Sequence, residues 1–225
     1  MIPLTALLER LDQTGLLLET QGSFDSNNMI GHLAHDSRKV GPSGLFVAIR
    51  GEKVDGHLFI DKAVENKAIA VVCEVMPEGV LRRVPGVALA RVRDGRAALA
   101  ELAAAFYGDP SRQLRMLGIT GTNGKTTTVY LLHHLLTALG EKAGLISTIE
   151  YRFGEAPVAS THTTPDALDL HRMLRRMVEA GCTACAMEVS SHALEQHRVR
   201  GVAFDVAVFT NLTRDHLDYH HTFED

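Results

Sequence analysis

The stretch GITGTNGKTTTVYLL, residues 118–132, constrains the fold of this chain more than any other part. An apolar segment at 114–119 leads into a glycine-rich turn, after which Lys125 and three threonines open a segment with helical spacing. A strand, a glycine turn and a helix in this order form a phosphate-binding loop, because the first N–H groups of the helix point at anionic oxygens. We therefore expect a strand at 114–119 and a helix at 125–139 that ends at Gly140.

The spacing of the glycines differs from that of most phosphate-binding loops. The common pattern G-x-x-x-x-G-K-[ST] requires glycine at position 119, where this chain has Ile119, and glycines stand instead at Gly118 and Gly121. Lys125 is expected to hold the β- and γ-phosphates of a nucleotide, and the hydroxyl of Thr126 to ligate Mg²⁺. The alternative, an ordinary turn that contains glycine, leaves the position of this Lys-Thr pair unexplained.

Strand and helix patterns alternate after Pro110, which predicts a parallel, doubly wound sheet. A second helix is expected to begin with Thr164 as N-cap and Pro165 as its first residue, and to end at Gly181. Ligands bind such sheets at the carboxyl ends of the strands. The other strands are expected at 143–149, 183–189 and 205–210, and polar clusters follow Ile119, Met187 and Phe209.

The first part of the chain is expected to form a separate, smaller α/β domain. Short apolar segments at 45–49 and 70–73 have the length of strands, and the segment between them has nearly helical spacing. Residues 77–85 are expected to form a loop, and 95–107 a helix that Gly108-Asp109-Pro110 ends. The boundary therefore divides the chain into domains at 1–108 and 109–225.

Composition excludes several classes of protein. Of the 225 residues, 45% are hydrophobic and 22% charged, which is typical of a soluble globular protein. A net charge of −4 gives no basic surface for nucleic acid. No apolar run approaches the roughly 18 residues of a membrane span, and the acidic N-terminus is unlike a signal peptide. Three cysteines indicate reduced thiols and a cytoplasmic location.

Two polar segments are candidates for binding metal. In AMEVSSHAL, Glu188 ends an apolar strand and is well placed to hold Mg²⁺, although a capping or salt-bridging glutamate is the alternative. In FTNLTRDHLDYHH, His216 is a candidate for a magnesium site. His216 and His220 also have the spacing of a zinc pair, but the glutamate of H-E-x-x-H is missing. Cys182 and Cys185 form a C-x-x-C, which we interpret as buried, inert thiols, since residues three apart on a strand face opposite sides.

The segments GTNGKTTT, MEVSSHAL and TNLTRDHLDYH together resemble the Mur ligase family, whose phosphate loop is written G-T-N-G-K-[ST]. HDSRKVGPSGLFVAIRG resembles the UDP-binding domain of that family, in which D-S-R precedes an L-F-V-A strand. The resemblance covers the chain from about Leu33 onward. It implies a small N-terminal α/β domain that binds UDP, followed by a mostly parallel ATP-binding domain.

The resemblance also implies an activity, which is ATP-dependent formation of an amide bond in peptidoglycan precursor synthesis. The segment M-E-V-S-S-H is most similar to members that add a diamino acid to UDP-N-acetylmuramoyl-L-alanyl-D-glutamate through an acyl phosphate. We expect meso-diaminopimelate as the diamino acid and a monomeric, cytoplasmic protein.

Site residues are implied position by position. ATP is expected to contact Gly118, Thr120, Gly121, Thr122, Asn123, Gly124, Lys125, Thr126 and Thr127. The uridine part is expected to contact His35, Ser37, Glu52, Lys53 and Val54. The muramoyl-dipeptide is expected to contact His162, Thr163 and Thr164, and its D-glutamyl end Ser190, Gln196 and Arg198. The family commonly has asparagine where this chain has His162, and Arg198 has a surface arginine as its alternative interpretation. Thr126, Glu188 and His216 are expected to hold two Mg²⁺ ions, and Lys125, Glu188 and His216 to act in catalysis.

Two alternatives stay open. One is a related ligase such as MurF or folylpolyglutamate synthase, although the D-S-R segment argues against the folate enzyme. The other is a nucleotide-binding regulatory or scaffold module without ligase activity. The resemblance further implies an amino-terminal fragment that ends before a carbamylated lysine and lacks the C-terminal domain for the incoming amino acid. On that basis we expect weak nucleotide binding, no ligation, and an uncovered sheet edge.

Overall fold

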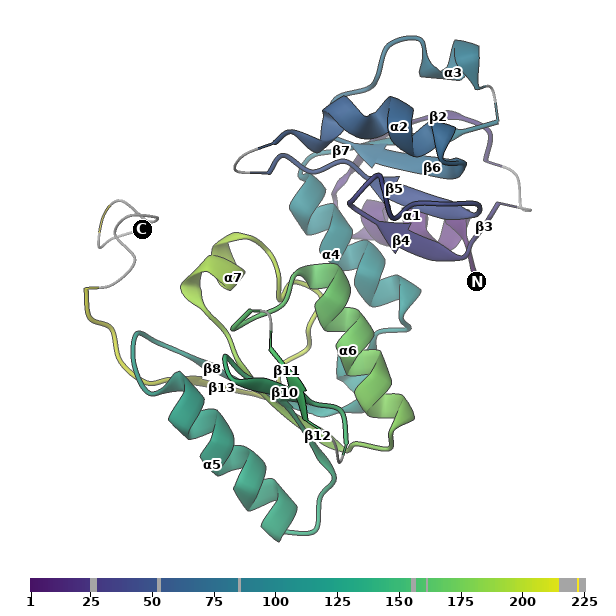
Figure 1. Cartoon of the computed structure of the whole chain (residues 1–225). Coiled ribbons are helices and arrows are strands. Elements are labelled where there is room, and N and C mark those ends of the chain that lie inside the picture. Colours follow the sequence, from purple (N-terminus) through teal and green to yellow (C-terminus); the bar gives the residue numbers. More distant parts are fainter. Residues whose placement is uncertain are drawn as a thin grey trace. The chain divides into compact units, whose positions relative to one another are not determined.

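The computed structural model describes residues 1–24, 28–51, 54–84, 86–154, 157–160, 162–214 and 222. The chain folds as two compact units, Met1–Gly108 and Asp109–Asp225 (Figure 1). The break between them falls in the Gly108-Asp109-Pro110 segment, where Gly108 and Asp109 have positive φ angles of 74° and 47°. None of the helices in the described ranges is long and apolar enough to cross a membrane.

The first unit is built on a five-stranded sheet with the order β2-β7-β6-β5-β4. Strands β4, β5, β6 and β7 are parallel, and β2 pairs with β7 in the antiparallel direction. The strands are β2 (Leu17–Gly22), β4 (His32–Ala34), β5 (Gly44–Val47), β6 (Ala68–Cys73) and β7 (Ala88–Val92), with a separate antiparallel pair of β1 (Ile2–Pro3) and β3 (Met29–Ile30).

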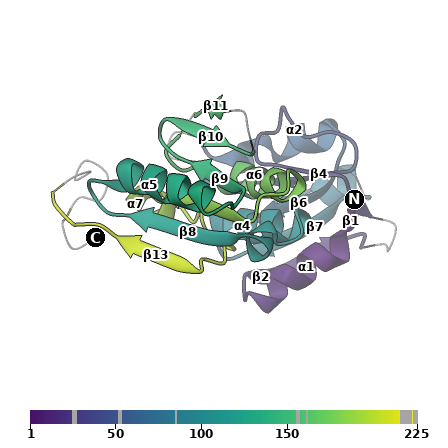
Figure 2. The ribbon, with the colours of Figure 1, turned by 90° about the horizontal axis from the view of Figure 1, so that it is seen from below.

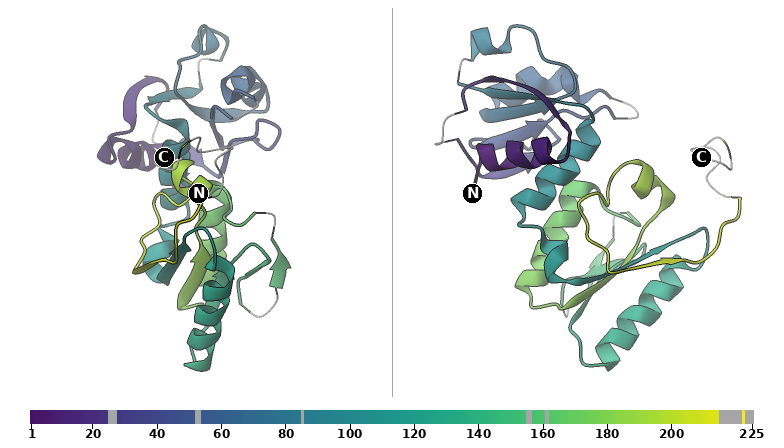
Figure 3. Two further views of the ribbon diagram at one scale, coloured as in Figure 1. Left: turned by 90° about the vertical axis from the view of Figure 1, so that its left-hand side faces the viewer. Right: turned by 180° about the vertical axis from the view of Figure 1, so that it is seen from behind.

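Helices cover both faces of this sheet. Ile60 and Val80, from α2 (Ile60–Glu65) and α3 (Val80–Arg83), pack with Phe46, Val71 and Leu89 on one face. On the other face, Leu4 and Leu8 of α1 (Leu4–Gln13) lie against Ala70 and Val72 of β6 (Figure 3). Helix α4 (Gly95–Phe106) packs against α1, and a 3₁₀ turn, η1 (Gly56–Phe59), precedes α2.

The second unit has a six-stranded sheet with the order β11-β10-β9-β12-β8-β13. Strands β9, β12, β8 and β13 are parallel, whereas β10 and β11 extend the sheet as an antiparallel edge. The strands are β8 (Arg115–Thr120), β9 (Ala143–Ile146), β10 (Glu150–Arg152), β11 (Pro157–Ala159), β12 (Ala184–Glu188) and β13 (Val206–Phe209).

The alternation of side chains along β12 builds two cores, one on each face. Ala184 and Ala186 face α5 (Lys125–Ala138), whose Val129 and Leu136 are buried there. Met187 faces the opposite core, which contains residues of α6 (Ala167–Glu179), so that the two helices lie on opposite faces of the sheet (Figure 1). A 3₁₀ turn, η2 (Pro110–Gln113), opens the unit, and α7 (Ser191–Glu195) follows β12.

Strand β13 lies at one edge of this sheet, beside β8 (Figure 2). Val206 is 45% exposed and Phe209 is 63% exposed on this strand. Leu131, Leu135 and Leu139 are also exposed, and their spacing of four residues places them along one side of the α5 segment.

Three expectations about elements are wrong. Residues 77–85 contain a helical turn, α3, because Val80 is drawn into the core behind the left-handed Gly79. The strand expected at 143–149 stops at Ile146, since the Ser147 side chain and backbone bond the Glu150 carbonyl and turn the chain back. Helix α6 is capped by Asp166, whose carboxylate accepts the N–H of Asp169, and not by Thr164.

Candidate functional site

The glycine-rich turn between β8 and α5 has the backbone of a phosphate loop. Gly121 and Gly124 have φ angles of +127° and +86°, a region that residues with a Cβ rarely adopt. A Cβ on Gly121 would also lie 2.8 Å from the carbonyl oxygen of Asn211. Glycine is therefore required at position 121 both by the backbone angle and by the close packing of the neighbouring chain.

Lys125, the first residue of α5, folds back over this loop. Its Nζ donates to the carbonyl oxygens of Gly121 at 2.6 Å and Thr122 at 2.9 Å. The ammonium group is thus held beside the N-terminus of the helix, where the helix dipole and free N–H groups favour an anion. The arrangement can accept phosphate oxygens if the lysine exchanges carbonyl partners for them.

The segment after β13 fixes the tip of the loop. Thr210 and Asn211 donate from their side chains to the carbonyl oxygen of Asn123, at 2.7 and 3.0 Å. Asn211 also accepts the N–H of Asn123 through Oδ1, and Thr213 exchanges two hydrogen bonds with the hydroxyl of Thr122. The sequence predicted a polar cluster after this strand but not its structural role, which is to bond the residues at the tip of the phosphate loop.

Glu188 lies at the carboxyl end of β12 and is 1% exposed. The hydroxyl of Thr126 donates to its Oε2 at 3.0 Å, and the backbone N–H of Thr148 donates to Oε1 at 2.9 Å. Because β12 lies between β8 and β9, residues that follow these three strands meet at one edge of the sheet. Thr148 was missed in the sequence, because the strand expected to run through position 149 concealed its place at the edge.

The donor atoms at this edge fit Mg²⁺. A hydroxyl and a buried carboxylate are hard oxygen ligands, and Mg²⁺ is commonly held by one or two carboxylates together with phosphate oxygens and water. Within the described ranges, no group of three or more His, Cys, Asp and Glu side chains is arranged to hold a metal on its own. His216, and with it the zinc alternative of His216 and His220, lies outside the described residues.

The residues expected to meet the muramoyl-dipeptide gather around the same strand end. Thr164 donates its hydroxyl to the carbonyl oxygen of Glu188 at 2.9 Å and accepts the N–H of Ser190 at 3.2 Å. Arg198 donates to the carbonyl oxygen of Thr164 at 2.9 Å and to Oε1 of Gln196 at 2.6 and 3.0 Å. Arg198 is therefore a partly buried member of a hydrogen-bond network, contrary to its interpretation as a surface arginine.

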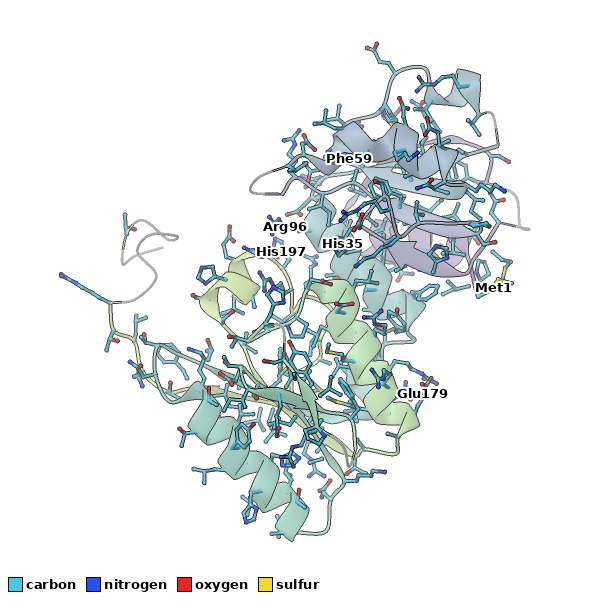
Figure 4. All side chains as sticks on the ribbon, viewed as in Figure 1. Met1, His35, Phe59, Arg96, Glu179 and His197 are labelled. Carbon is cyan, nitrogen blue, oxygen red and sulfur yellow. The ribbon has the colours of Figure 1, made fainter. Side chains whose placement is uncertain are left out.

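Two local features lie next to this network in the sequence. His197, labelled in Figure 4, has a left-handed φ of 56°, and the flanking Gln196 and Arg198 side chains bond to each other. Tyr151 is 2% exposed, and its hydroxyl donates to the carbonyl oxygen of His162 at 2.6 Å while accepting the N–H of the same residue. Tyr151 was not identified in the sequence because it lies on β10, a strand that was not predicted.

In the first unit, the D-S-R segment forms a turn after β4. Arg38 donates to both carboxylate oxygens of Asp36, at 2.9 and 2.8 Å, and this contact lowers the pKa of Asp36 to about 2. Ser37 is buried and its carbonyl oxygen accepts a hydrogen bond from Asn66, whereas His35 is exposed (Figure 4).

A short loop follows β5 in the same unit. Its base is closed by a bridge between Arg50 and Asp55, and Gly51 donates its N–H to the carbonyl oxygen of Val54. His57 stabilises this base, since its Nδ1 lies 2.6 Å from Oδ1 of Asp55. Val54 is exposed, and Glu52 and Lys53, also expected to contact the uridine part, lie outside the described residues.

The three cysteines are free, and Cys182 and Cys185 are buried as predicted, as is Cys73. Burial raises the pKa of the Cys73 thiol to about 12 and raises the pKa of Cys182 and Cys185 as well. The reason given for the C-x-x-C pair is wrong, because Cys182 precedes β12 and packs in the same core as Cys185. We therefore attribute the inertness of these thiols to their burial and not to positions on opposite faces of a strand.

Two family models match the chain. The model described as Mur ligase family, catalytic domain, matches residues 29–107, and the Mur ligase middle domain matches residues 119–225. The chain is 50% identical over 218 residues to UDP-N-acetylmuramoyl-L-alanyl-D-glutamate--2,6-diaminopimelate ligase of Parabacteroides distasonis, which covers 96% of the chain and 44% of that protein. It is 50% identical over 190 residues to the protein of the same name from Geobacter metallireducens, covering 84% of the chain and 36% of that protein.

Solved structures agree in fold. The structure of a UDP-N-acetylmuramoyl-L-alanyl-D-glutamate--2,6-diaminopimelate ligase matches with a TM-score of 0.74 and 30% identity, over 92% of this chain and 41% of that one. MurF from Acinetobacter baumannii matches with a TM-score of 0.63 over 99% of this chain and 44% of that one, and at 20% identity it shares the fold alone. The chain spans less than half the length of these relatives.

Proposed function

Because the chain belongs to the Mur ligase family, we propose that it supplies the UDP-sugar-binding and ATP-binding parts of a ligase that adds a diamino acid to UDP-N-acetylmuramoyl-L-alanyl-D-glutamate. The names of the relatives support this substrate and support 2,6-diaminopimelate as the amino acid. We propose the cytoplasm as the location, because ATP, the proposed co-substrate, is available there.

One observation carries the proposal, namely the hydrogen bond between Thr126 and Glu188 at the edge of the sheet. It joins the first turn of α5, behind a glycine loop, to a buried carboxylate on the neighbouring strand. Proteins that hold Mg²⁺ and a triphosphate use this pairing of a loop hydroxyl with a strand carboxylate. Gly118, Thr120, Gly121, Thr122, Asn123, Gly124, Lys125, Thr126 and Thr127 are the proposed ATP-binding residues.

The chemistry that these residues must assist is the attack of a carboxylate on an anionic γ-phosphate. Thr126 and Glu188 would hold Mg²⁺, which when bound neutralises phosphate charge. Lys125 and the loop N–H groups bind phosphate oxygens and stabilise the charge that develops in phosphoryl transfer. The attack releases ADP and leaves an acyl phosphate on the substrate. An amine then attacks the acyl carbon and releases phosphate, so no side-chain nucleophile is needed.

Positioning of the substrate falls to the network around Thr164. Arg198, held by Gln196 and by the carbonyl of Thr164, presents a guanidinium group suited to a carboxylate. Ser190, Thr163 and His162 complete the proposed contacts to the muramoyl-dipeptide. In the Met1–Gly108 unit, His35, Ser37, Glu52, Lys53 and Val54 are the proposed contacts to the uridine part.

Two other functions predict a different preference for muramoyl-peptide substrates. A MurF-type ligase would prefer the UDP-muramoyl-tripeptide to the dipeptide as substrate. A non-catalytic module would bind nucleotide without preferring either muramoyl-peptide. The 50% identity to two diaminopimelate ligases favours the dipeptide.

The proposal is tested by Mg²⁺-dependent binding of a non-hydrolysable ATP analogue, measured by calorimetry. Lys125→Ala is expected to weaken binding about tenfold or more, since charge-assisted hydrogen bonds contribute about 1.5–3 kcal/mol each. Lys142→Ala is the matched control, because Lys142 also donates to a backbone carbonyl, that of Ala180, but lies outside the loop. Equal affinities of the two variants would contradict the assignment of the loop.

A further inference from the structure

The carboxylate of Glu188 is held on both of its oxygens by a single residue. Thr148 donates its backbone N–H to Oε1 at 2.9 Å, and its hydroxyl oxygen lies 3.3 Å from Oε2. Thr126 donates to the same Oε2 from the phosphate loop. Thr148 therefore shares an oxygen of Glu188 with a residue proposed to bind the metal.

The hydroxyl of Thr148 has a second neighbour, the hydroxyl oxygen of Thr163 at 3.1 Å. A hydroxyl has one proton to donate and two lone pairs with which to accept. A carboxylate that holds a metal ion is ionised and can only accept. Thr148 cannot donate its single proton to both neighbours, whereas a chain in which Thr163 donates to Thr148 and Thr148 donates to Glu188 satisfies all three groups.

The segment that contains Thr163 is anchored on both sides. Tyr151 binds both the N–H and the carbonyl of His162, and Thr164 bonds the backbone of Glu188 and Ser190. Thr163 stands between these anchors, so its backbone is held where its hydroxyl can reach that of Thr148. The hydroxyl of Thr148 thus lies in contact with both Glu188 and the anchored segment 162–164.

The turn that presents Thr148 is fixed independently of Glu188. Ser147 accepts the N–H groups of Ile149 and Glu150 on its hydroxyl and is fully buried. Thr148 itself is exposed, and its carbonyl accepts a hydrogen bond from Ser160. Replacing only the hydroxyl of Thr148 leaves the turn intact and does not open the core.

We infer that Thr148 is a positioning residue that couples binding of the muramoyl-dipeptide at residues 162–164 to binding of the divalent cation at Thr126 and Glu188. The inference rests on the proposed function, since it requires both ligands to bind where that function assigns them. It adds Thr148, which contacts Glu188 on the side of the cation and Thr163 on the side of the dipeptide.

The test compares Thr148→Val, which has the same shape without the hydroxyl, with Thr148→Ser, which keeps it. Thr137→Val is the control, because it removes one exposed hydroxyl that donates to the His133 carbonyl on α5. Mn²⁺ affinity of the 225-residue chain is measured by electron paramagnetic resonance, and the Kd of UDP-N-acetylmuramoyl-L-alanyl-D-glutamate is measured with and without Mg²⁺-ADP. Melting temperatures of all variants are recorded.

We expect Thr148→Val to lower Mn²⁺ affinity about tenfold. Losing a hydrogen-bond partner of a metal ligand commonly lowers affinity by about 10- to 100-fold. The low end is expected here because the backbone N–H of Thr148 still bonds Oε1 of Glu188. The factor by which Mg²⁺-ADP changes the Kd of the dipeptide nucleotide should fall toward one. Thr148→Ser and Thr137→Val should retain the wild-type values, with similar melting temperatures throughout.

Unchanged Mn²⁺ affinity and an unchanged coupling factor in Thr148→Val would overturn the inference while the proposed function stands. A wild-type chain that binds neither Mg²⁺-ADP nor the dipeptide nucleotide would overturn the proposed function and the inference with it.

Discussion

Glu188 shows how one buried side chain can join three strands at the site. Its carboxylate accepts from Thr126 after β8 and from Thr148 after β9, and its own carbonyl accepts from Thr164. A charge taken out of water in this way is tolerated only when it is hydrogen-bonded or metal-bound. These hydrogen bonds satisfy the buried charge and fix the orientation of the carboxylate, as its proposed role as a metal ligand requires.

Glu188→Gln removes the negative charge of this side chain and keeps its shape, so it tests the contribution of the charge alone. The amide oxygen can accept the Thr148 N–H, and the hydroxyl of Thr126 can rotate to accept from the amide nitrogen, so the fold is retained. Mg²⁺-dependent nucleotide binding should fall at least tenfold, since an uncharged amide is a poor ligand for a hard cation. Calorimetry with Mg²⁺-ADP measures this, with Glu141→Gln as the control, because Glu141 bonds Arg115 and Thr183 away from the site. A variant that binds like the control would exclude Glu188 as a metal ligand.

Asp36 offers a prediction about pH. Its pKa is lowered from 3.8 to about 2, chiefly because the Arg38 side chain donates to it. A lowered pKa in the folded state stabilises the fold above the unfolded value of 3.8, and that contribution is lost as the pH falls through about 2. In an NMR titration, the Asp36 carboxyl should have its midpoint near 2 in the wild type and at a higher pH in Arg38→Met, which loses the largest of the causes that lower its pKa. Equal midpoints would show that the ion pair does not form in solution.

At the scale of elements, helix α6 begins after Asp166, whose short side chain accepts a hydrogen bond from an N–H group of the first turn. Asp166 lies in extended conformation, with φ −62° and ψ 162°, and accepts the N–H of Asp169 at 2.9 Å. Thr164, two residues earlier, has its hydroxyl engaged by Glu188 and Ser190. The helix and the site therefore use different residues of one segment.

Asp166→Ala should destabilise the second unit by about 1 kcal/mol, the usual cost of removing an N-cap side chain. Urea unfolding followed by circular dichroism measures the change. Asp169→Ala, which removes an exposed ion pair with Arg172 and an acidic charge in the first turn of α6, should cost less, because alanine also has the higher helix propensity. If both substitutions cost the same, Asp166 is not the cap.

The sequence was sufficient for elements whose patterns are local. The helix predicted at 125–139 is observed as Lys125–Ala138, and the strand predicted at 205–210 as Val206–Phe209. Strands β10 and β11 are short and antiparallel, and the pairing of β10 with β9 and of β11 with β10 is not revealed by any local pattern. Thr148 and Tyr151 were missed for the same reason, because both owe their place in the site to the turn at Ser147.

At the scale of the whole molecule, the two units have separate cores. Residues of β5, β6, α2 and α3 form one of the cores of Met1–Gly108, and the cores of Asp109–Asp225 lie on the two faces of a different sheet. Each unit can therefore be considered a domain, the first proposed to bind the UDP-sugar and the second ATP.

Residues 1–108 expressed alone should fold cooperatively. The five-stranded sheet of this unit is covered on both faces by its own helices, and the core cluster that contains Phe46 consists of residues of this unit. A single sigmoidal thermal transition by circular dichroism is expected, and added UDP should shift NMR signals around Ser37. A molten product, or UDP shifts confined to other surfaces, would count against this assignment.

The central claim is that the turn at 121–126 and Glu188 form the site of Mg²⁺ and ATP. A crystal structure of the chain with Mg²⁺ and a non-hydrolysable ATP analogue tests it most directly. We predict that the phosphates lie against the N–H groups of the loop, with Mg²⁺ about 2.1 Å from the hydroxyl oxygen of Thr126, the usual distance for this ion. A nucleotide bound with its phosphates away from the loop, or Mg²⁺ without contact to Thr126 and Glu188, would contradict the account.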